Sequence, residues 1–151
     1  LLWLAAGPDL LGHLRAQGAG AVDLEIARGT AAFSMVVAVH CCSRSEARRL
    51  AHLALALDRR LKTITVGDND IDIPDPEDVA WGLAPRWQPA RDTVVIEGTD
   101  AYVIDPSASG AGQGSKAAFI ALHAAGGGDE PMRLDAAALA KAQALFRQPV
   151  L

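Results

Sequence analysis

Residues 66–97, VGDNDIDIPDPEDVAWGLAPRWQPARDTVVIE, decide the fold predicted for this chain. They begin with the end of an apolar run and continue into an acidic loop, in which Asp68, Asp70 and Asp72 alternate with other residues. Ligands of open α/β sheets usually bind just beyond the carboxyl ends of the strands. Because the loop directly follows a strand-like run, it is the first candidate for a functional site.

A short helix is predicted after the acidic loop. Asp75 can accept an N-terminal amide hydrogen bond, and Pro76 has no amide hydrogen to leave unpaired. Pro85 disfavours continuation, so we expect the helix to end before Arg86. Residues 91–97 then have the composition of a strand covered on both faces.

The rest of the chain predicts an α/β domain. Residues 21–27 and 32–40 have the patterns of two strands that could form a hairpin. Ser43 and Glu46 have the spacing of a capping box before an amphipathic helix, and residues 62–67 resemble a buried strand. This succession predicts a layered α/β fold: a mostly parallel open sheet of about four to five strands, flanked by helices, with a C-terminal helix.

The glycine-rich segment at residues 107–115 departs from known phosphate-binding patterns. It lacks the Gly-Lys-Ser/Thr order of a P-loop and the spacing of a dinucleotide-binding loop. We expect either a plain linker or a mobile interface loop that leads into a helix at residues 116–124. Ser115 would cap that helix, and Lys116 would be free to meet an acid on another domain.

The loop aspartates have two interpretations. A calcium-binding loop is disfavoured, because Ile73 and Val79 stand where such a loop needs glycine and glutamate. In the first interpretation the aspartates cap the turn, face water or bind neighbouring amides. In the second they hold an arginine, such as Arg86, or contact a partner domain.

No other arrangement of reactive side chains has a recognisable spacing. Cys41 and Cys42 are adjacent, which disfavours a disulfide between them, and we expect reduced thiols. A Cys-His pair with His40 is the alternative, and it would permit nucleophilic chemistry. We identify no catalytic, cofactor-binding or metal-ligating residue.

Length and composition predict one ordinary globular domain spanning residues 1–151. Half of the residues are hydrophobic, 21% are charged, and the formal net charge is −4. These values give no reason to expect binding to nucleic acid or to an anionic membrane. No apolar run approaches the roughly 20 residues needed to span a bilayer, so we expect a cytoplasmic location.

The order DxDIDIxDPEDVAWxLAxRxxPxRDTVVIE at residues 68–97, followed by GQGSKAA at residues 112–118, resembles the C-terminal domain of the UbiD-type decarboxylases. Those enzymes use prenylated FMN to remove or add carboxyl groups on unsaturated and aromatic acids. The resemblance extends more loosely from about residue 21 to the end of the chain. At residues 39–42 the chain has Val-His-Cys-Cys, where members of the family commonly carry a basic run.

The resemblance implies a division of labour. In the family, the prenylated FMN, its metal ions and the acid/base residues belong to the preceding domain. We therefore expect this chain to bind no cofactor alone and to act as a small subunit or C-terminal domain, in a homo- or hetero-oligomer with a UbiD-like catalytic partner. Its role would be assembly and active-site closure. The alternative is a non-catalytic binding or scaffold module that has kept the fold.

The loop aspartates, Arg86 and the end of the glycine-rich segment could form contacts with a partner domain. The candidate interface or cleft residues are Asp68, Asp70, Asp72, Arg86, Ser115 and Lys116.

Overall fold

The computed structural model describes residues 2–18, 20–27, 29–31, 33–40, 43–109, 112–124, 135, 137, 138, 140, 141 and 144. In chain order the elements are α1 (Leu2–Ala16), β1 (Ala21–Ile26), β2 (Ser34–Val39), α2 (Arg44–Leu57), β3 (Thr63–Asp68), α3 (Pro76–Arg86), α4 (Pro89–Asp92), β4 (Thr93–Asp100) and β5 (Gln113–Ala121). None of the helices in this described part is long and apolar enough to cross a membrane.

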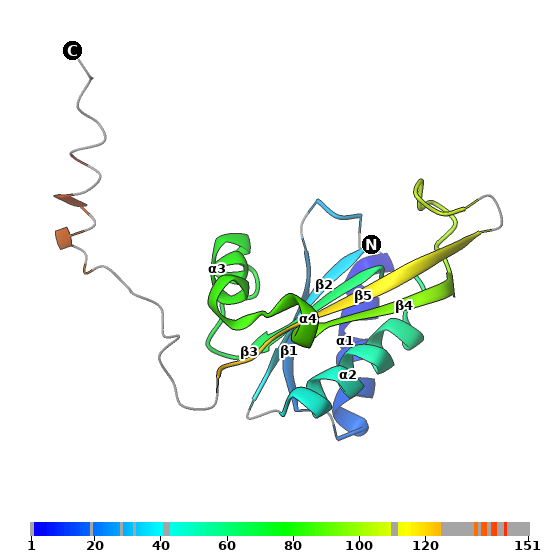
Figure 1. The fold of residues 1–151 in the computed structure, drawn as a ribbon, viewed down its shortest axis with the longest axis horizontal. Coiled ribbons are helices and arrows are strands. Elements are labelled where there is room, and N and C mark those ends of the chain that lie inside the picture. The colour runs from blue at the N-terminus through cyan, green and yellow to red at the C-terminus, as the bar shows by residue number, and fades with distance from the viewer. Residues whose placement is uncertain are drawn as a thin grey trace, which may run out of the picture.

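The five strands form one open mixed sheet in the order β1-β2-β3-β5-β4 (Figure 1). β2, β3 and β5 are parallel, whereas β1 and β4 run antiparallel to their neighbours at the two edges. The α/β fold class is therefore confirmed, as is the hairpin of β1 and β2. The predicted series of parallel crossovers holds only for β2-α2-β3.

Local capping signals confirm both predicted helix starts. The Ser43 hydroxyl accepts a hydrogen bond from the Glu46 amide, and the Glu46 carboxylate accepts one from the Ser43 amide. The Asp75 carboxylate accepts a hydrogen bond from the Glu77 amide at the start of α3. Such caps stabilise helix ends because the first amides of a helix have no partner within it.

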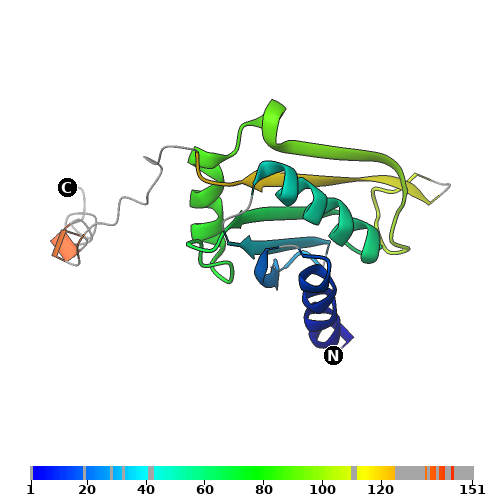
Figure 2. The ribbon, with the colours of Figure 1, turned by 90° about the horizontal axis from the view of Figure 1, so that it is seen from below.

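Helices α1 and α2 cover one face of the sheet (Figure 2). The main core lies between them and the sheet, and Leu14, Leu50, Ile64 and Ile120 are among its members. The opposite face carries a smaller cluster under the loop that precedes α3, made by Val36, Ala38, Ile71 and Ile73 with Val79 packed against it. The second face thus carries α3 and the acidic loop.

Three predictions about secondary structure need comment. β4 is an edge strand and not a doubly covered one, since its Val95 side chain is 59% exposed. The predicted helix at residues 116–124 is wrong, because β5 occupies residues 113–121 and is paired with β3 and β4. The predicted C-terminal helix lies mostly outside the described residues, and Cys41 and Cys42 also lie outside them. Among the described residues near the C-terminus, the Asp135 carboxylate accepts a hydrogen bond of 2.7 Å from the Ala138 amide.

Candidate functional site

The acidic loop lies at the carboxyl end of β3, as predicted, and beside the carboxyl end of β5 and helix α3 (Figure 1). Its anchor is Ile71, which is only 7% exposed. The Ile71 side chain lies against Gly67 and Gly82, and a Cβ built on Gly82 would come within 2.4 Å of Ile71 Cδ1. The two glycines therefore leave the space in which the loop closes onto the sheet and α3.

A buried arginine holds the loop from α3. Arg86 Nη1 and Nη2 donate to the two carboxylate oxygens of Asp70 at 2.8 and 2.6 Å. The Arg86 side chain is fully buried, whereas that of Asp70 is 37% exposed. The guanidinium also lies over the Trp81 ring, 5.4 Å from its centroid. This paired fork confirms the interpretation in which the loop carboxylates hold Arg86.

The same contact perturbs the acid. The pKa of Asp70 lies below its usual value, mainly because Arg86 donates hydrogen bonds to the carboxylate. Partial burial acts in the opposite direction, and the positive charge of Arg86 lowers the pKa further. Asp70 is therefore held ionised with one face open to solvent.

The predicted position of Arg86 is wrong. Arg86 is the last residue of α3 and not the first residue beyond it. Pro85 lies inside the last turn, where it removes one backbone hydrogen bond, and the helix ends one residue later. The helix therefore sets the direction from which Arg86 reaches the loop.

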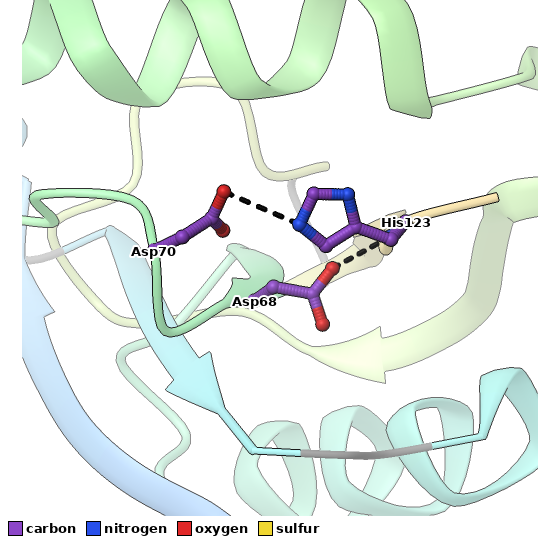
Figure 3. A group of neighbouring side chains, drawn as sticks. All are labelled: Asp68, Asp70 and His123. Carbon is purple, nitrogen blue, oxygen red and sulfur yellow. Dashed lines mark hydrogen bonds and ion pairs between the residues drawn. The ribbon is translucent and has the colours of Figure 1, made fainter. Parts of the chain in front are cut away.

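The side chains of Asp68, Asp70 and His123 lie close together, as Figure 3 shows. Asp68 Oδ2 accepts a hydrogen bond of 2.6 Å from the backbone amide of His123, which follows β5. His123 Nε2 lies 3.2 Å from Asp70 Oδ2. One ligand-type atom from each of the three residues lies within 4.8 Å of the other two. Among the described residues, this is the arrangement that could hold a metal ion.

The loop and the first turn of α3 form an acidic surface, which we define as Asp70, Asp72, Asp75, Glu77 and Asp78. Four of these residues are exposed and Asp78 is half-buried. The Asp78 carboxylate accepts the Asp72 amide at 2.6 Å, which ties the loop to the helix. The surface is thus negatively charged and held in a fixed shape.

The structure separates Ser115 and Lys116 from this surface. Both belong to β5, so Ser115 caps no helix. Lys116 is 7% exposed and its Nζ donates to the carbonyls of Leu55 and Asp58 at 2.7 and 3.1 Å. The expectation that Lys116 is free to reach another domain is therefore wrong. Its amine instead binds carbonyls at the C-terminal end of α2.

His123 was missed as a member of the site. The sequence offers no local signal for it, because its partners Asp68 and Asp70 lie far away along the chain and approach only when β3 and β5 pair. Correct assignment of residues 113–121 as a strand parallel to β3 would have placed His123 at the same sheet edge as the loop.

An open α/β sheet with an acidic loop at its carboxyl edge defines a domain class, and sequence comparison identifies the family. Residues 3–121 match the family model of the 3-octaprenyl-4-hydroxybenzoate carboxy-lyase C-terminal domain. Because the match covers most of the chain, this protein belongs to the UbiD C-terminal domain family.

Two curated relatives are decarboxylases. The chain is 38% identical over 76 residues to the anhydromevalonate phosphate decarboxylase of Archaeoglobus fulgidus, and 34% identical over 74 residues to that of Aeropyrum pernix. The matched segments cover 50% and 49% of this chain but only 18% and 17% of the relatives. The similarity thus concerns a small part of each relative.

Solved structures of a UbiD-class enzyme and of a second decarboxylase share the fold. HmfF from Pelotomaculum thermopropionicum, in complex with FMN, superposes with a TM-score of 0.73 at 23% identity, covering 92% of this chain and 32% of that one. Vanillic acid decarboxylase from Sedimentibacter hydroxybenzoicus, in closed form, gives a TM-score of 0.69 at 19% identity, covering 92% and 31%. In both cases the shared fold is about a third of the larger chain.

Proposed function

We propose that this chain serves as the C-terminal domain or small subunit of a UbiD-type carboxy-lyase acting on an unsaturated or aromatic acid. Its contribution is assembly and closure of an active site that a partner catalytic domain provides. The observation that carries the proposal is the family match over residues 3–121, which spans the sheet, the acidic loop and α3. The decarboxylase relatives, several times longer than the matched segment, support it.

The acidic surface is the part of the chain suited to docking. Ile71 packing and the Arg86–Asp70 pair fix its shape before any partner arrives, so little ordering entropy is lost on binding. Its charge favours a partner face rich in lysine and arginine. The partner should therefore bind more weakly as the salt concentration rises.

An apolar groove lies next to the acidic surface and would supply the dry part of the interface. It has a volume of about 190 Å³ and opens beside α3, between the helix and the first two strands. Protein interfaces commonly combine an apolar centre with a polar rim. The residues lining the groove are Glu25, Ala27, Val36, Ile73, Pro74, Pro76, Val79, Ala80 and Leu83.

The flavin and its divalent metal are proposed to belong to the catalytic partner. The residues at this sheet edge do not fit a flavin phosphate, because the exposed groups other than His123 are carboxylates and Arg86 already binds Asp70. A phosphate placed here would be repelled by like charge. The role proposed for this chain is accordingly to cover a pocket and exclude water, with no catalytic residue of its own.

Charge reversal on the acidic surface tests this proposal. We expect Asp72→Lys/Glu77→Lys to weaken binding to the prenylated-FMN-bearing catalytic partner, measured by light scattering after size exclusion and by a salt titration of affinity. The matched control Glu97→Lys/Asp100→Lys makes the same charge change at exposed positions of β4. If both double variants bind like the wild type, the acidic surface is not the docking face. If the wild type forms no complex with that partner, the chain is a separate binding module.

A further inference from the structure

Asp68, Asp70 and His123 offer two carboxylate oxygens and one imidazole nitrogen at a single sheet edge (Figure 3). Asp68 ends β3, Asp70 lies two residues further along the loop, and His123 lies two residues beyond β5. The site is therefore built from two neighbouring parallel strands, whose relative positions are fixed by their hydrogen bonds. Ligands carried on paired strands are held more precisely than ligands carried on one loop.

Both carboxylates are oriented by contacts that a bound ion could leave in place, whereas the 3.2 Å contact between His123 Nε2 and Asp70 Oδ2 is one that the ion would replace. Asp68 Oδ2 accepts the His123 amide, and Asp68 keeps a second oxygen. The two Asp70 oxygens each accept one bond from Arg86, and every carboxylate oxygen has two lone pairs. Hydrogen bonds of this kind from a surrounding shell orient ligands in metal sites and tune their affinity.

The exposure of the three residues suits an ion that keeps some of its water. The side chains of His123 and Asp70 are 38% and 37% exposed, and that of Asp68 is 15% exposed. One donor atom from each residue already lies within 4.8 Å of the other two. Metal–ligand bonds of roughly 2.1 Å would bring these atoms within about 4 Å of one another, so shifts of about 1 Å suffice.

The local charges and the types of ligand atom together define the class of ion. Two carboxylates and the Arg86 guanidinium sum to one negative charge, which a divalent cation would overcompensate by one unit. Three protein donors are too few for calcium, which takes six to eight oxygens, and an imidazole is a poor ligand for magnesium. Imidazole combined with carboxylates suits first-row transition ions.

We propose that Asp68, Asp70 and His123 bind a divalent first-row transition-metal ion, such as Mn²⁺ or Zn²⁺, with water completing its coordination. The site belongs to this chain and does not depend on the proposed role in a decarboxylase. It would link the ends of β3 and β5, and it shares Asp70 with the acidic surface.

Paramagnetic line broadening with Mn²⁺ tests the site and locates it. Mn²⁺ is the probe because thiolates bind it poorly, so Cys41 and Cys42 contribute little. In amide NMR spectra of the whole chain, substoichiometric Mn²⁺ should broaden signals around Asp68, Asp70 and His123 first. Broadening centred elsewhere, or absent at millimolar Mn²⁺, overturns the proposal.

Matched histidine variants then test the ligand set. His123→Gln should weaken Mn²⁺ binding by about tenfold or more, since even loss of an outer partner of a ligand costs that much. His52→Gln removes an exposed histidine on α2 and should bind Mn²⁺ like the wild type. Equal affinity of His123→Gln and wild type contradicts the proposal, as does tighter binding of Ca²⁺ or Mg²⁺ than of Mn²⁺. The proposed docking role fails separately, by absence of a complex with the catalytic partner.

Discussion

Removal of the negative charge of Asp70 should destabilise the fold through Arg86, although Asp70 is itself partly exposed. In Asp70→Asn the side-chain shape is kept. The two charged hydrogen bonds of 2.8 and 2.6 Å are replaced by at most one hydrogen bond to a neutral amide oxygen. The Arg86 guanidinium then stays in a site where its side chain is 0% exposed, with the Asp68 carboxylate, 3.9 Å from Nη1, left to offset its charge. We expect the free energy of unfolding to fall.

The magnitude follows from the two exposures. Breaking a fully buried ion pair by removing one partner costs about 3–5 kcal/mol. Asp70 is 37% exposed, so solvent screens part of the interaction, and the weaker cost of about 1.5–3 kcal/mol for a charged hydrogen bond is the better guide. We therefore expect a loss of about 2 kcal/mol for Asp70→Asn.

A double-mutant cycle separates the pair from its surroundings. Arg86→Met keeps most of the apolar packing against Trp81 and removes the buried charge. Urea unfolding of wild type, Asp70→Asn, Arg86→Met and the double variant should give a coupling of about 1 kcal/mol or more, with the double variant more stable than the sum of the singles predicts. Coupling near zero would refute the view that Arg86 holds the loop through Asp70.

Three further outcomes test other parts of the structure. Gly82→Ala should destabilise the fold by about 1 kcal/mol in urea unfolding, because the new Cβ would lie 2.4 Å from Ile71 Cδ1. Adding Ile71→Val should reduce that loss. A Gly82→Ala variant as stable as the wild type would contradict the packing of Ile71 against Gly82. Lys116→Met should cost about 1–3 kcal/mol by leaving two carbonyls without their donor, whereas unchanged stability with weakened assembly would indicate an intermolecular role. The pKa of the fully buried Asp92 is lowered overall. Burial acts to raise this pKa, but hydrogen bonds from Arg91 and the Gln88 amide, together with nearby arginine charges, lower it by more. The stabilisation by Asp92 is therefore complete above the unfolded pKa of about 3.9 and is lost as pH falls through the lower folded value, so acid unfolding of Asp92→Asn should depend less on pH below about 4 than that of wild type.

Local signals in the sequence predicted local structure well. The capping box of Ser43 and Glu46 and the cap at Asp75 involve residues within three positions of each other, so the sequence alone specifies them. The position of the acidic loop directly after β3 was likewise predicted from neighbouring residues. The pairing of Asp70 with Arg86 was open to prediction because a single short helix joins the two residues.

Long-range pairing explains the errors. Residues 113–121 include an alanine-rich run that favours a helix by intrinsic propensity, but pairing with both β3 and β4 makes them a strand. Once that strand was missed, the burial of Lys116 and the approach of His123 to Asp70 were missed with it. The edge position of β4 has the same cause, since the sequence does not reveal which strand inserts between β3 and β4.

The decisive measurement is the rate of decarboxylation by the proposed prenylated-FMN-bearing catalytic partner, with and without this chain, on a panel of unsaturated and aromatic acids. We expect the wild-type chain and Glu97→Lys/Asp100→Lys to raise the rate, and Asp72→Lys/Glu77→Lys to fail to do so at physiological salt. A catalytic partner that is fully active and correctly assembled without this chain would contradict the account.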